Sequence, residues 1–373
     1  MDRFFKFSER GTNLRTEVVA GLTTFMTMAY IIFVNPAILS TEGTGLSAEG
    51  VFVATCLAAA AASIAMGVVA NFPVALASGL GLNAVVAFTL ILGLGIPWQT
   101  AMAAVIVEGL IVTLLVLTNL REAVLNAIPL SLKFAIAVGI GLFIAFIGLK
   151  NAGIVVLDPV TYLTLGDFTQ GPVLLALFGL AITLALVARG LRGGLIAGIL
   201  LTAVVGMVLG VVPFPSAVAS LNLDTSTIGG GVLALPDVLQ LTLLPVIFAL
   251  FMTDFFDTMG TVIAVGQEAK LLDEDGRLPN AKRVLLVDSL AAVGGGAMGA
   301  SSVTSYIESG SGVAEGGRTG MTSVVVGILF LLALPFSPLV TVIGGACRSR
   351  EGRTGPRSSF LPLRRPRSSS SAS

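Results

Sequence analysis

The stretch FALFMTDFFDTMGTVIAVG, residues 248–266, is apolar enough to lie in a bilayer for nearly its whole length, yet Asp254 and Asp257 stand at its middle. No lysine or arginine lies within it. An aspartate at the centre of a spanning helix costs roughly 2.5 to 3.5 kcal/mol on insertion scales. Two such residues in one span therefore require a functional reason for their burial.

The composition of the whole chain is that of an integral membrane protein. Of its 373 residues, 55% are hydrophobic and 11% are charged, and the mean hydropathy is +0.98. A soluble domain cannot carry so much apolar surface. Apolar runs of about 20 residues, the length of a spanning helix, recur about every 25 residues. The sequence predicts an all-α polytopic membrane protein.

Hydropathy places eleven spans along the chain, and the positive charges orient them. With the N-terminus in the cytoplasm, thirteen lysines and arginines fall on the inner side and only Lys150 on the outer side, as the positive-inside rule requires. We therefore expect a multi-pass protein of the cell membrane with a cytoplasmic N-terminus. The predicted spans are 17–38, 50–70, 73–94, 97–118, 131–149, 172–189, 194–213, 240–264, 282–300, 302–316 and 320–343.

The C-terminal segment 344–373, GGACRSREGRTGPRSSFLPLRRPRSSSSAS, departs from this pattern. It holds seven arginines and no lysine, and the span count puts it outside, against the rule that the other loops obey. We expect an aberrant end that replaces further membrane spans. A genuine interaction tail is the alternative.

Two of the predicted spans are interrupted. NFPVALASGLGLNAVVAFTL (71–90) has Pro73 and two glycines before Asn83, and GASSVTSYIESGSGVAEGG (299–317) is rich in Ser, Thr and Gly around Glu308. Each is typical of a short extended piece followed by a half-helix. Non-helical backbone at membrane depth is tolerated only where protein or a watery cavity covers it. Paired interruptions of this kind point to a transporter binding site.

A single offset of 225 residues relates the two halves of the chain. It pairs Asn83 with Glu308, and Ala29 with Asp254, so it matches both the interrupted spans and the two unusual full helices. Seven spans separate the members of each pair. Because seven is odd, the second copy is expected to be inverted across the membrane.

The acidic residues carry the predicted chemistry. Asp254 and Asp257 stand three residues apart and are expected to share one helix face. Pairing with basic residues or capping of helix ends would be a purely structural role, but no Lys or Arg lies inside any predicted span. Carboxylates in a low dielectric repel one another, so at least one should hold a proton near neutral pH. Because the chain has no histidine, a proton relay must use carboxylates.

Other polar residues in the spans have simpler expected roles. Asn83 is a site candidate, with capping of a half-helix as the alternative. Glu108 could form a hydrogen bond in helix packing, and Asn35, before a proline, is expected to end a helix. Asp288 is expected to pair with Lys282 or Arg283.

These segments resemble the hallmark motifs of the azaguanine-type purine permeases, a branch of the nucleobase-ascorbate or nucleobase-cation-symport-2 transporters. The resemblance runs from about residue 1 to Ile343. It implies fourteen spans in two inverted repeats of seven, divided into a core and a gate domain, and proton-coupled uptake of hypoxanthine, guanine or adenine. The matching segments are TTFMTMAYIIFVNPAIL (23–39), SGLGLNA (78–84), DFFDTMGT (254–261) and TSYIESGSGVAEGGRTG (304–320).

Carried over by motif, the resemblance assigns a role to each candidate residue. It implies substrate binding by Asp254, Glu308, Asn83 and Gly81, and proton coupling by Asp257 and Glu308. A purine offers ring N–H donors in its plane, which carboxylates accept. A stacking aromatic is also expected, with three local candidates that the sequence does not rank: Phe255, Phe256 and Tyr306.

The same comparison divides the chain. It implies a core domain from residues 1–118 and 240–343, spans 1–4 and 8–11, and a gate domain from residues 119–239, spans 5–7. Tail 344–373 stands where spans 12–14 should be, so about eleven of fourteen spans are present. We expect this chain to bind purine poorly and not to transport it.

Several other functions are disfavoured. An anion transporter or channel of the sulfate-permease kind is the main alternative, but Glu308 follows the break where an anion site should be basic or neutral. A membrane scaffold or receptor needs no buried acids. An enzyme is not expected, and neither is a cofactor or a metal, because no nucleophile–base pair or ligand cluster is visible. The expected partners are a purine nucleobase and the bilayer, not nucleic acid; a homodimer is one option.

Overall fold

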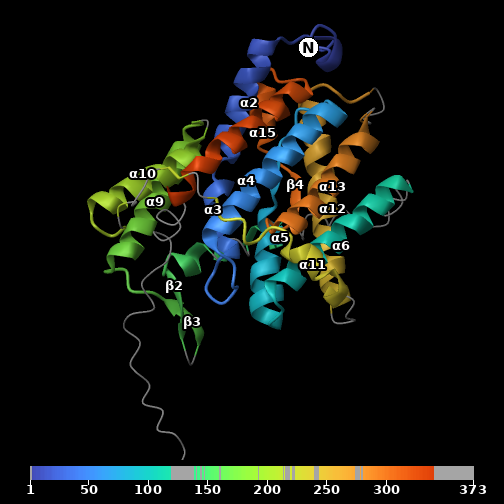
Figure 1. Ribbon diagram of the computed structural model, residues 1–373. Helices are drawn as coiled ribbons and strands as arrows, with labels where there is room; N and C mark the ends of the chain where they lie inside the picture. Colours follow the sequence, from blue (N-terminus) through green and yellow to red (C-terminus); the bar gives the residue numbers. More distant parts are fainter. Residues whose placement is uncertain are drawn as a thin grey trace, which may run out of the picture.

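The computed structural model describes residues 2–118, 148–158, 161–191, 193–212, 223–238, 243–273 and 280–339, with a few isolated residues between these ranges. Most of the described residues are helical, and they also include two short two-stranded sheets (Figure 1). The elements in chain order are α1 (Asp2–Phe5), α2 (Leu14–Met28), α3 (Ile31–Leu39), α4 (Ala48–Ala65), the π-helix η1 (Met66–Ala70), β1 (Leu76–Ser78), α5 (Leu80–Ala84), the π-helix η2 (Val85–Gly93), α6 (Trp98–Leu117), β2 (Val155–Asp158), β3 (Tyr162–Leu165), α9 (Gly171–Ala188), α10 (Gly194–Val208), α11 (Gly230–Leu233), the 3₁₀-helix η3 (Leu235–Val238), α12 (Leu244–Glu268), α13 (Ala281–Met298), β4 (Val303–Ser305), α14 (Ser309–Ala314), α15 (Gly320–Ala333) and the 3₁₀-helix η5 (Leu334–Phe336).

Six helical segments in the described residues are long and apolar enough to cross a membrane: Leu14–Leu39, Ala48–Ala70, Trp98–Leu117, Gly171–Ala188, Leu244–Glu268 and Gly320–Leu339. Two shorter apolar helices, Leu80–Gly93 and Gly194–Val208, accompany them. These segments agree with the spans predicted from hydropathy, so the chain is a multi-pass membrane protein. Predicted span 131–149 and tail 344–373 lie largely or wholly outside the described residues.

The main bundle is held by close helix contacts. α13 packs along α6, and α15 packs along α4 and α2. Small residues allow these helices to approach: a Cβ added at Gly109 of α6 would lie 2.8 Å from the backbone nitrogen of Val293 on α13. Without a hydrophobic force between helices in lipid, such close backbone contact is a main source of association.

At the centre of this bundle, strands β1 and β4 pair antiparallel (Figure 1). This pair of strands is called the β1–β4 crossing below. Their partners are Leu76 with Ser305, Ala77 with Thr304 and Ser78 with Val303. Half-helices follow both strands, α5 continuing into η2, and α14. The two interrupted spans predicted from the sequence are therefore confirmed. The 225-residue offset also relates Ser78 to Val303, which are direct partners in this ladder.

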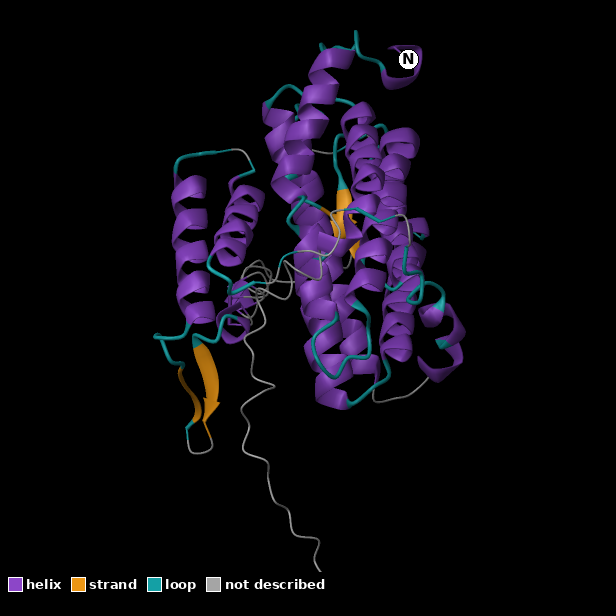
Figure 2. Cartoon of the chain, turned by 60° about the vertical axis from the view of Figure 1, so that its left-hand side comes forward, coloured by secondary structure: helices purple, strands orange, loops and turns teal. Residues whose placement is uncertain are grey.

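A second group of elements lies beside the main bundle (Figure 2). It consists of α9, α10 and the β2–β3 hairpin, in which Val155 pairs with Leu165. α9 and α10 pack tightly, because Gly179 faces Thr202 across their interface. α10 also contacts α2, and Gly193 lies against Met26.

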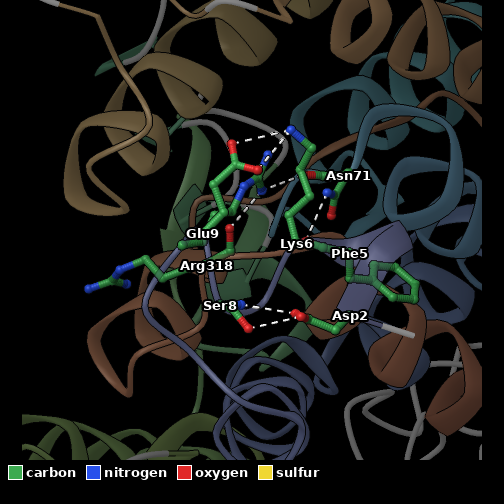
Figure 3. A network of polar contacts seen from close by, with 8 residues as sticks. Asp2, Phe5, Lys6, Ser8, Glu9, Asn71 and Arg318 are labelled. Atoms are coloured by element: carbon green, nitrogen blue, oxygen red, sulfur yellow. Dashed lines mark hydrogen bonds and ion pairs between the residues drawn. The ribbon is translucent and has the colours of Figure 1, made fainter.

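The N-terminal segment is tied to one end of the bundle by polar contacts (Figure 3). The Nη1 atom of Arg10 donates to the carbonyl oxygens of Asn71, at 2.7 Å, and Arg318, at 2.8 Å. Asn71 in turn donates to the carbonyl of Phe5 at 3.1 Å. A cavity of about 200 Å³ lies beside this network, away from the β1–β4 crossing. These contacts join the segment before α2 to the start of the first interrupted span, at Asn71, and to Arg318, which directly follows the second.

Candidate functional site

The candidate site residues converge on α12. This helix packs against β4, α14 and α5, the elements that make up the two broken spans, and against α6. Asp254 and Asp257 lie on α12, Asn83 on α5, and Glu308 just before α14. Residues that are far apart in the sequence are thus gathered around the β1–β4 crossing.

Asp254 points into the bundle. Its side chain is 1% exposed, and its Oδ1 accepts a hydrogen bond from the hydroxyl of Ser302 at 3.4 Å. Ser302 immediately precedes β4, so this bond links α12 to the crossing. The carboxyl group of Glu108 on α6, which is also fully buried, is in contact with Asp254. The predicted substrate carboxylate is therefore one of two adjacent buried acids.

Asp288 anchors β4 to α12 and α13. It accepts hydrogen bonds from the backbone nitrogen of Ser305 at 2.9 Å, from the Ser305 hydroxyl at 2.7 Å and from the Thr258 hydroxyl at 2.6 Å. The predicted pairing of Asp288 with Lys282 or Arg283 is wrong. Asp288 lies two turns further into the bundle than those exposed cations and is fully buried.

Glu308 is half-buried at the start of α14. Its Oε1 accepts a hydrogen bond from the hydroxyl of Tyr30 at 2.6 Å, so the first spanning segment also reaches the site. One turn along α14, the hydroxyl groups of Ser311 and Thr27 lie 2.9 Å apart. Glu308 therefore has one carboxylate oxygen bonded to Tyr30 and lies at a partly open surface.

Asn83 is completely buried in α5. Its Oδ1 accepts from the hydroxyl of Ser78 at 2.9 Å, whereas its Nδ2 has no hydrogen-bond partner in the described part of the chain. Ser78 thus connects the end of β1 to the half-helix that follows it. Gly81 lies half-buried in the first turn of the same helix. An amide donor without a partner is a group that a ligand acceptor could use.

Asp257 is more exposed than Asp254. It is exposed on α12, whereas Asp254 is buried. Three residues turn a helix by about 300°, so the two side chains stand about 60° apart on neighbouring positions of one helix face. Asp257 lies near enough to Asp288 and Glu308 to interact with both electrostatically.

The three candidate stacking aromatics differ in their surroundings. Phe255 is fully buried and packs against Phe251 and Phe256 at centroid distances of 5.6 and 5.4 Å. Tyr306 is buried, and its hydroxyl donates to the Ser78 carbonyl. Phe256 is half-buried. The exposure of its ring therefore favours Phe256 as the one that a ligand could reach.

Sequence reasoning missed several of the side chains that build this region. Tyr30 and Ser302 both bond directly to candidate acids, but neither stands out in an apolar or Ser-rich stretch. Asn35 does not end a helix as expected: it lies inside α3 and donates to the Thr55 hydroxyl at 2.8 Å and to the Ala300 carbonyl at 3.2 Å. No described His, Cys, Asp or Glu cluster could hold a metal ion.

Comparison with known proteins now decides the family. The sequence model of the Permease family (Xan_ur_permease) matches residues 15–347. The chain belongs to this permease family. It is 46% identical over 351 residues to the guanine/hypoxanthine permease PbuG of Bacillus subtilis, and this alignment covers 92% of this chain and 80% of the relative. It is 45% identical over 345 residues to the adenine permease AdeP of Escherichia coli, covering 92% and 77%.

A solved structure shares the fold of this permease. The transmembrane domain of the cyanobacterial bicarbonate transporter BicA superposes with a TM-score of 0.62, covering 90% of this chain and 88% of that one, at 14% identity. The resemblance to purine permeases noted in the sequence is thus confirmed at the level of the family. These are transport proteins and not enzymes.

Proposed function

We propose that purine nucleobases are the substrates of this permease, with a proton as the coupling ion. The observation that carries the proposal is that both broken spans, which hold Asn83 and Glu308, pack against α12, the helix that holds the buried carboxyl of Asp254. Relatives that are 45% and 46% identical bear the names of adenine and guanine/hypoxanthine permeases. Acceptors and an amide donor together match the mixed donor and acceptor edge of a purine.

In this proposal each residue meets a different part of the base. Glu308 accepts a ring N–H, because one of its oxygens is already held by Tyr30 and the side chain lies at a partly open surface. Asn83 donates its Nδ2–H to a ring nitrogen or carbonyl, and Gly81 allows the base to approach the backbone. Asp254 accepts a second N–H, and Asp257 with Glu308 takes part in proton coupling.

The broader architecture follows the same resemblance. We infer two inverted repeats that form a core domain from residues 1–118 and 240–343 and a gate domain from residues 119–239, working by alternating access in the cell membrane with the N-terminus in the cytoplasm. The antiparallel β1–β4 ladder supports the inversion, and the separate α9–α10 group supports the division (Figure 2). The fold shared with BicA, a transmembrane transporter domain, is compatible with it.

Binding is the most direct test. The purified 373-residue chain in lipid nanodiscs is expected to bind labelled hypoxanthine, guanine or adenine weakly but saturably, and unlabelled purines should compete while uracil does not. Tyr30→Phe removes only the hydroxyl bonded to Glu308, so it should change the affinity by roughly five- to tenfold, the effect of about 1 kcal/mol. Glu9→Gln, at an exposed side chain far from the site, is the matched control. Absence of saturable binding for all three purines would refute the proposal.

A bicarbonate or sulfate transporter is the alternative on the same fold. Fold alone does not decide between these functions. The structure disfavours an anion because the half-buried carboxylate of Glu308 stands at the break before α14. Displacement of a bound purine by sulfate or bicarbonate at millimolar concentration would favour anion transport over purine transport.

A further inference from the structure

Glu108 is a buried acid to which the proposed transport mechanism assigns no role. It lies in the middle of α6, is 0% exposed, and neither of its carboxyl oxygens receives a hydrogen bond from a donor group in the described residues. An ionised carboxylate in this position would have lost its hydration with nothing to replace it. Its burial therefore needs an explanation that helix packing alone does not provide.

The groups around Glu108 are acids. α6 packs against α13 and α12, and the described charged residues that face Glu108 from those helices are Asp288 and Asp254. Asp288 has its oxygens occupied by Ser305 and Thr258. Asp254, in contrast, meets the Glu108 carboxyl itself.

Two carboxyl groups in contact require a proton between them. Both groups offer only acceptor atoms when ionised, so their contact is repulsive unless one of them holds a hydrogen and donates it to the other. With a proton present, the same contact becomes a short, charge-assisted hydrogen bond. Such a pair titrates as one unit that shares a single proton over a wide pH range.

We propose that Glu108 and Asp254 form a shared-proton site in the membrane interior, and that purine binding senses this proton. The proposal deepens the function proposed above and rests on it, because Asp254 is there assigned to the base. A proton on Glu108 leaves Asp254 ionised and able to accept a purine N–H. Loss of that proton places a second negative charge beside the charge of Asp254. The two carboxylates then repel each other, which moves Asp254 away from the position in which it accepts the purine N–H.

Glu108→Gln isolates this role. A glutamine has the same shape as the protonated glutamate and keeps a permanent N–H donor toward Asp254, so it imitates the proton without being able to release it. In the wild type, hypoxanthine affinity should fall at least tenfold between pH 6 and pH 9, whereas in Glu108→Gln it should change less than about threefold. Glu9→Gln, which alters an exposed acid in the N-terminal segment, should retain the wild-type pH profile.

Infrared spectroscopy provides a readout that does not depend on the substrate. The carbonyl stretch of a protonated carboxylic acid should be present in the wild type near neutral pH, absent in Glu108→Gln and retained in Glu9→Gln. If Glu108→Gln does not fold, Asp254→Asn should abolish the shared-proton band in its place. A band that survives both substitutions, or that disappears in Glu9→Gln, would overturn the shared-proton site.

The two readouts separate this proposal from the proposed function. A wild-type chain that binds purine with a pH profile unchanged by Glu108→Gln overturns the shared proton alone and leaves purine transport intact. A chain that binds no purine at any pH overturns the proposed function, and with it the link between the proton and the base.

Discussion

Glu17 joins α2 to α15, and its removal should destabilise the bundle strongly. The side chain stands in the first turn of α2 and is 0% exposed. It accepts hydrogen bonds from the backbone nitrogens of Arg318, at 2.8 Å, Thr319, at 3.3 Å, and Thr322, at 3.2 Å, and from the Thr322 hydroxyl, at 2.6 Å. These donors lie at and before the N-terminus of α15, where backbone N–H groups have no partner within the helix.

The size of the effect of Glu17→Ala follows from which donors lose their partner. The Thr322 nitrogen retains the carbonyl of Thr319 at 3.3 Å, and the Thr322 hydroxyl can rotate. The backbone nitrogens of the half-buried Arg318 and the buried Thr319 lose this acceptor. Each such group costs about 1 to 3 kcal/mol, and the lost anion at the helix N-terminus adds up to about 1 kcal/mol. The expected loss of stability is therefore about 2 to 7 kcal/mol.

Thermal unfolding in detergent, followed by the fraction that remains monodisperse on gel filtration, would measure this loss. Glu9→Ala is the matched control, because Glu9 is an acid of the same N-terminal region whose exposed ion pair with Lys6 should contribute less than about 1 kcal/mol. Glu17→Gln, which keeps one acceptor oxygen, should fall between the two. If Glu17→Ala unfolds at the same temperature as Glu9→Ala, the carboxylate does not hold α15 to α2 and the reasoning fails.

Two further predictions concern packing and pH. Gly320→Ala should destabilise the protein by about 1 to 3 kcal/mol, because the new methyl group would overlap the carbonyl oxygen of Gly67, whereas Gly260→Ala, which meets open space, should be nearly neutral in the same thermal assay. The hydroxyl of Ser47, together with a backbone N–H, holds the pKa of Asp224 below its ordinary 3.8, so its contribution to stability is present above that value and is lost as the pH falls through the lowered pKa. The stability difference between the wild type and Asp224→Asn should therefore shrink below about pH 4; a difference that grows on acidification would contradict this.

The sequence was informative wherever a residue type is rare in its setting. Two aspartates in an apolar run, and glycine or proline in spans that should be helical, are costly in lipid, so they pointed correctly to the region where β1 and β4 cross. The 225-residue offset found from Asn83 and Glu308 even relates two partners of the ladder, Ser78 and Val303. Hydrophobic periodicity and the energetic cost of placing a polar residue in lipid are properties of a single chain segment, so each segment can be interpreted without knowing its partners.

The partners of each polar residue could not be predicted in this way. Asp288 stands near basic residues in the sequence, and proximity suggested an ion pair, but its position along α13 carries it past them into the bundle. Asn35 precedes a proline and was expected to end a helix, yet it bonds across to Thr55 from within α3. Which side chain meets which depends on helix rotation and register, and these are set by contacts between segments far apart in the sequence.

The backbone of the broken spans explains why so many polar side chains are buried here and which of them remain for a ligand. A two-stranded ladder in a membrane has open edges, and each N–H on those edges needs a partner. Ser63 donates to the carbonyl of Leu76 at 3.0 Å and accepts from its nitrogen at 2.9 Å, and the Ser309 hydroxyl accepts from Ala75 at 3.0 Å.

Asp288 does the same for the nitrogen of Ser305 on the other strand. These residues complete the hydrogen bonds of the crossing, so their polarity is fully used by the fold. The Glu308 carboxylate lies at a partly open surface and, among the described residues, is bonded to the Tyr30 hydroxyl, and Asn83 keeps a donor without a described partner. The polar groups of the crossing thus divide into those that the backbone requires and those that it does not, and substrate recognition has to be built from the second group.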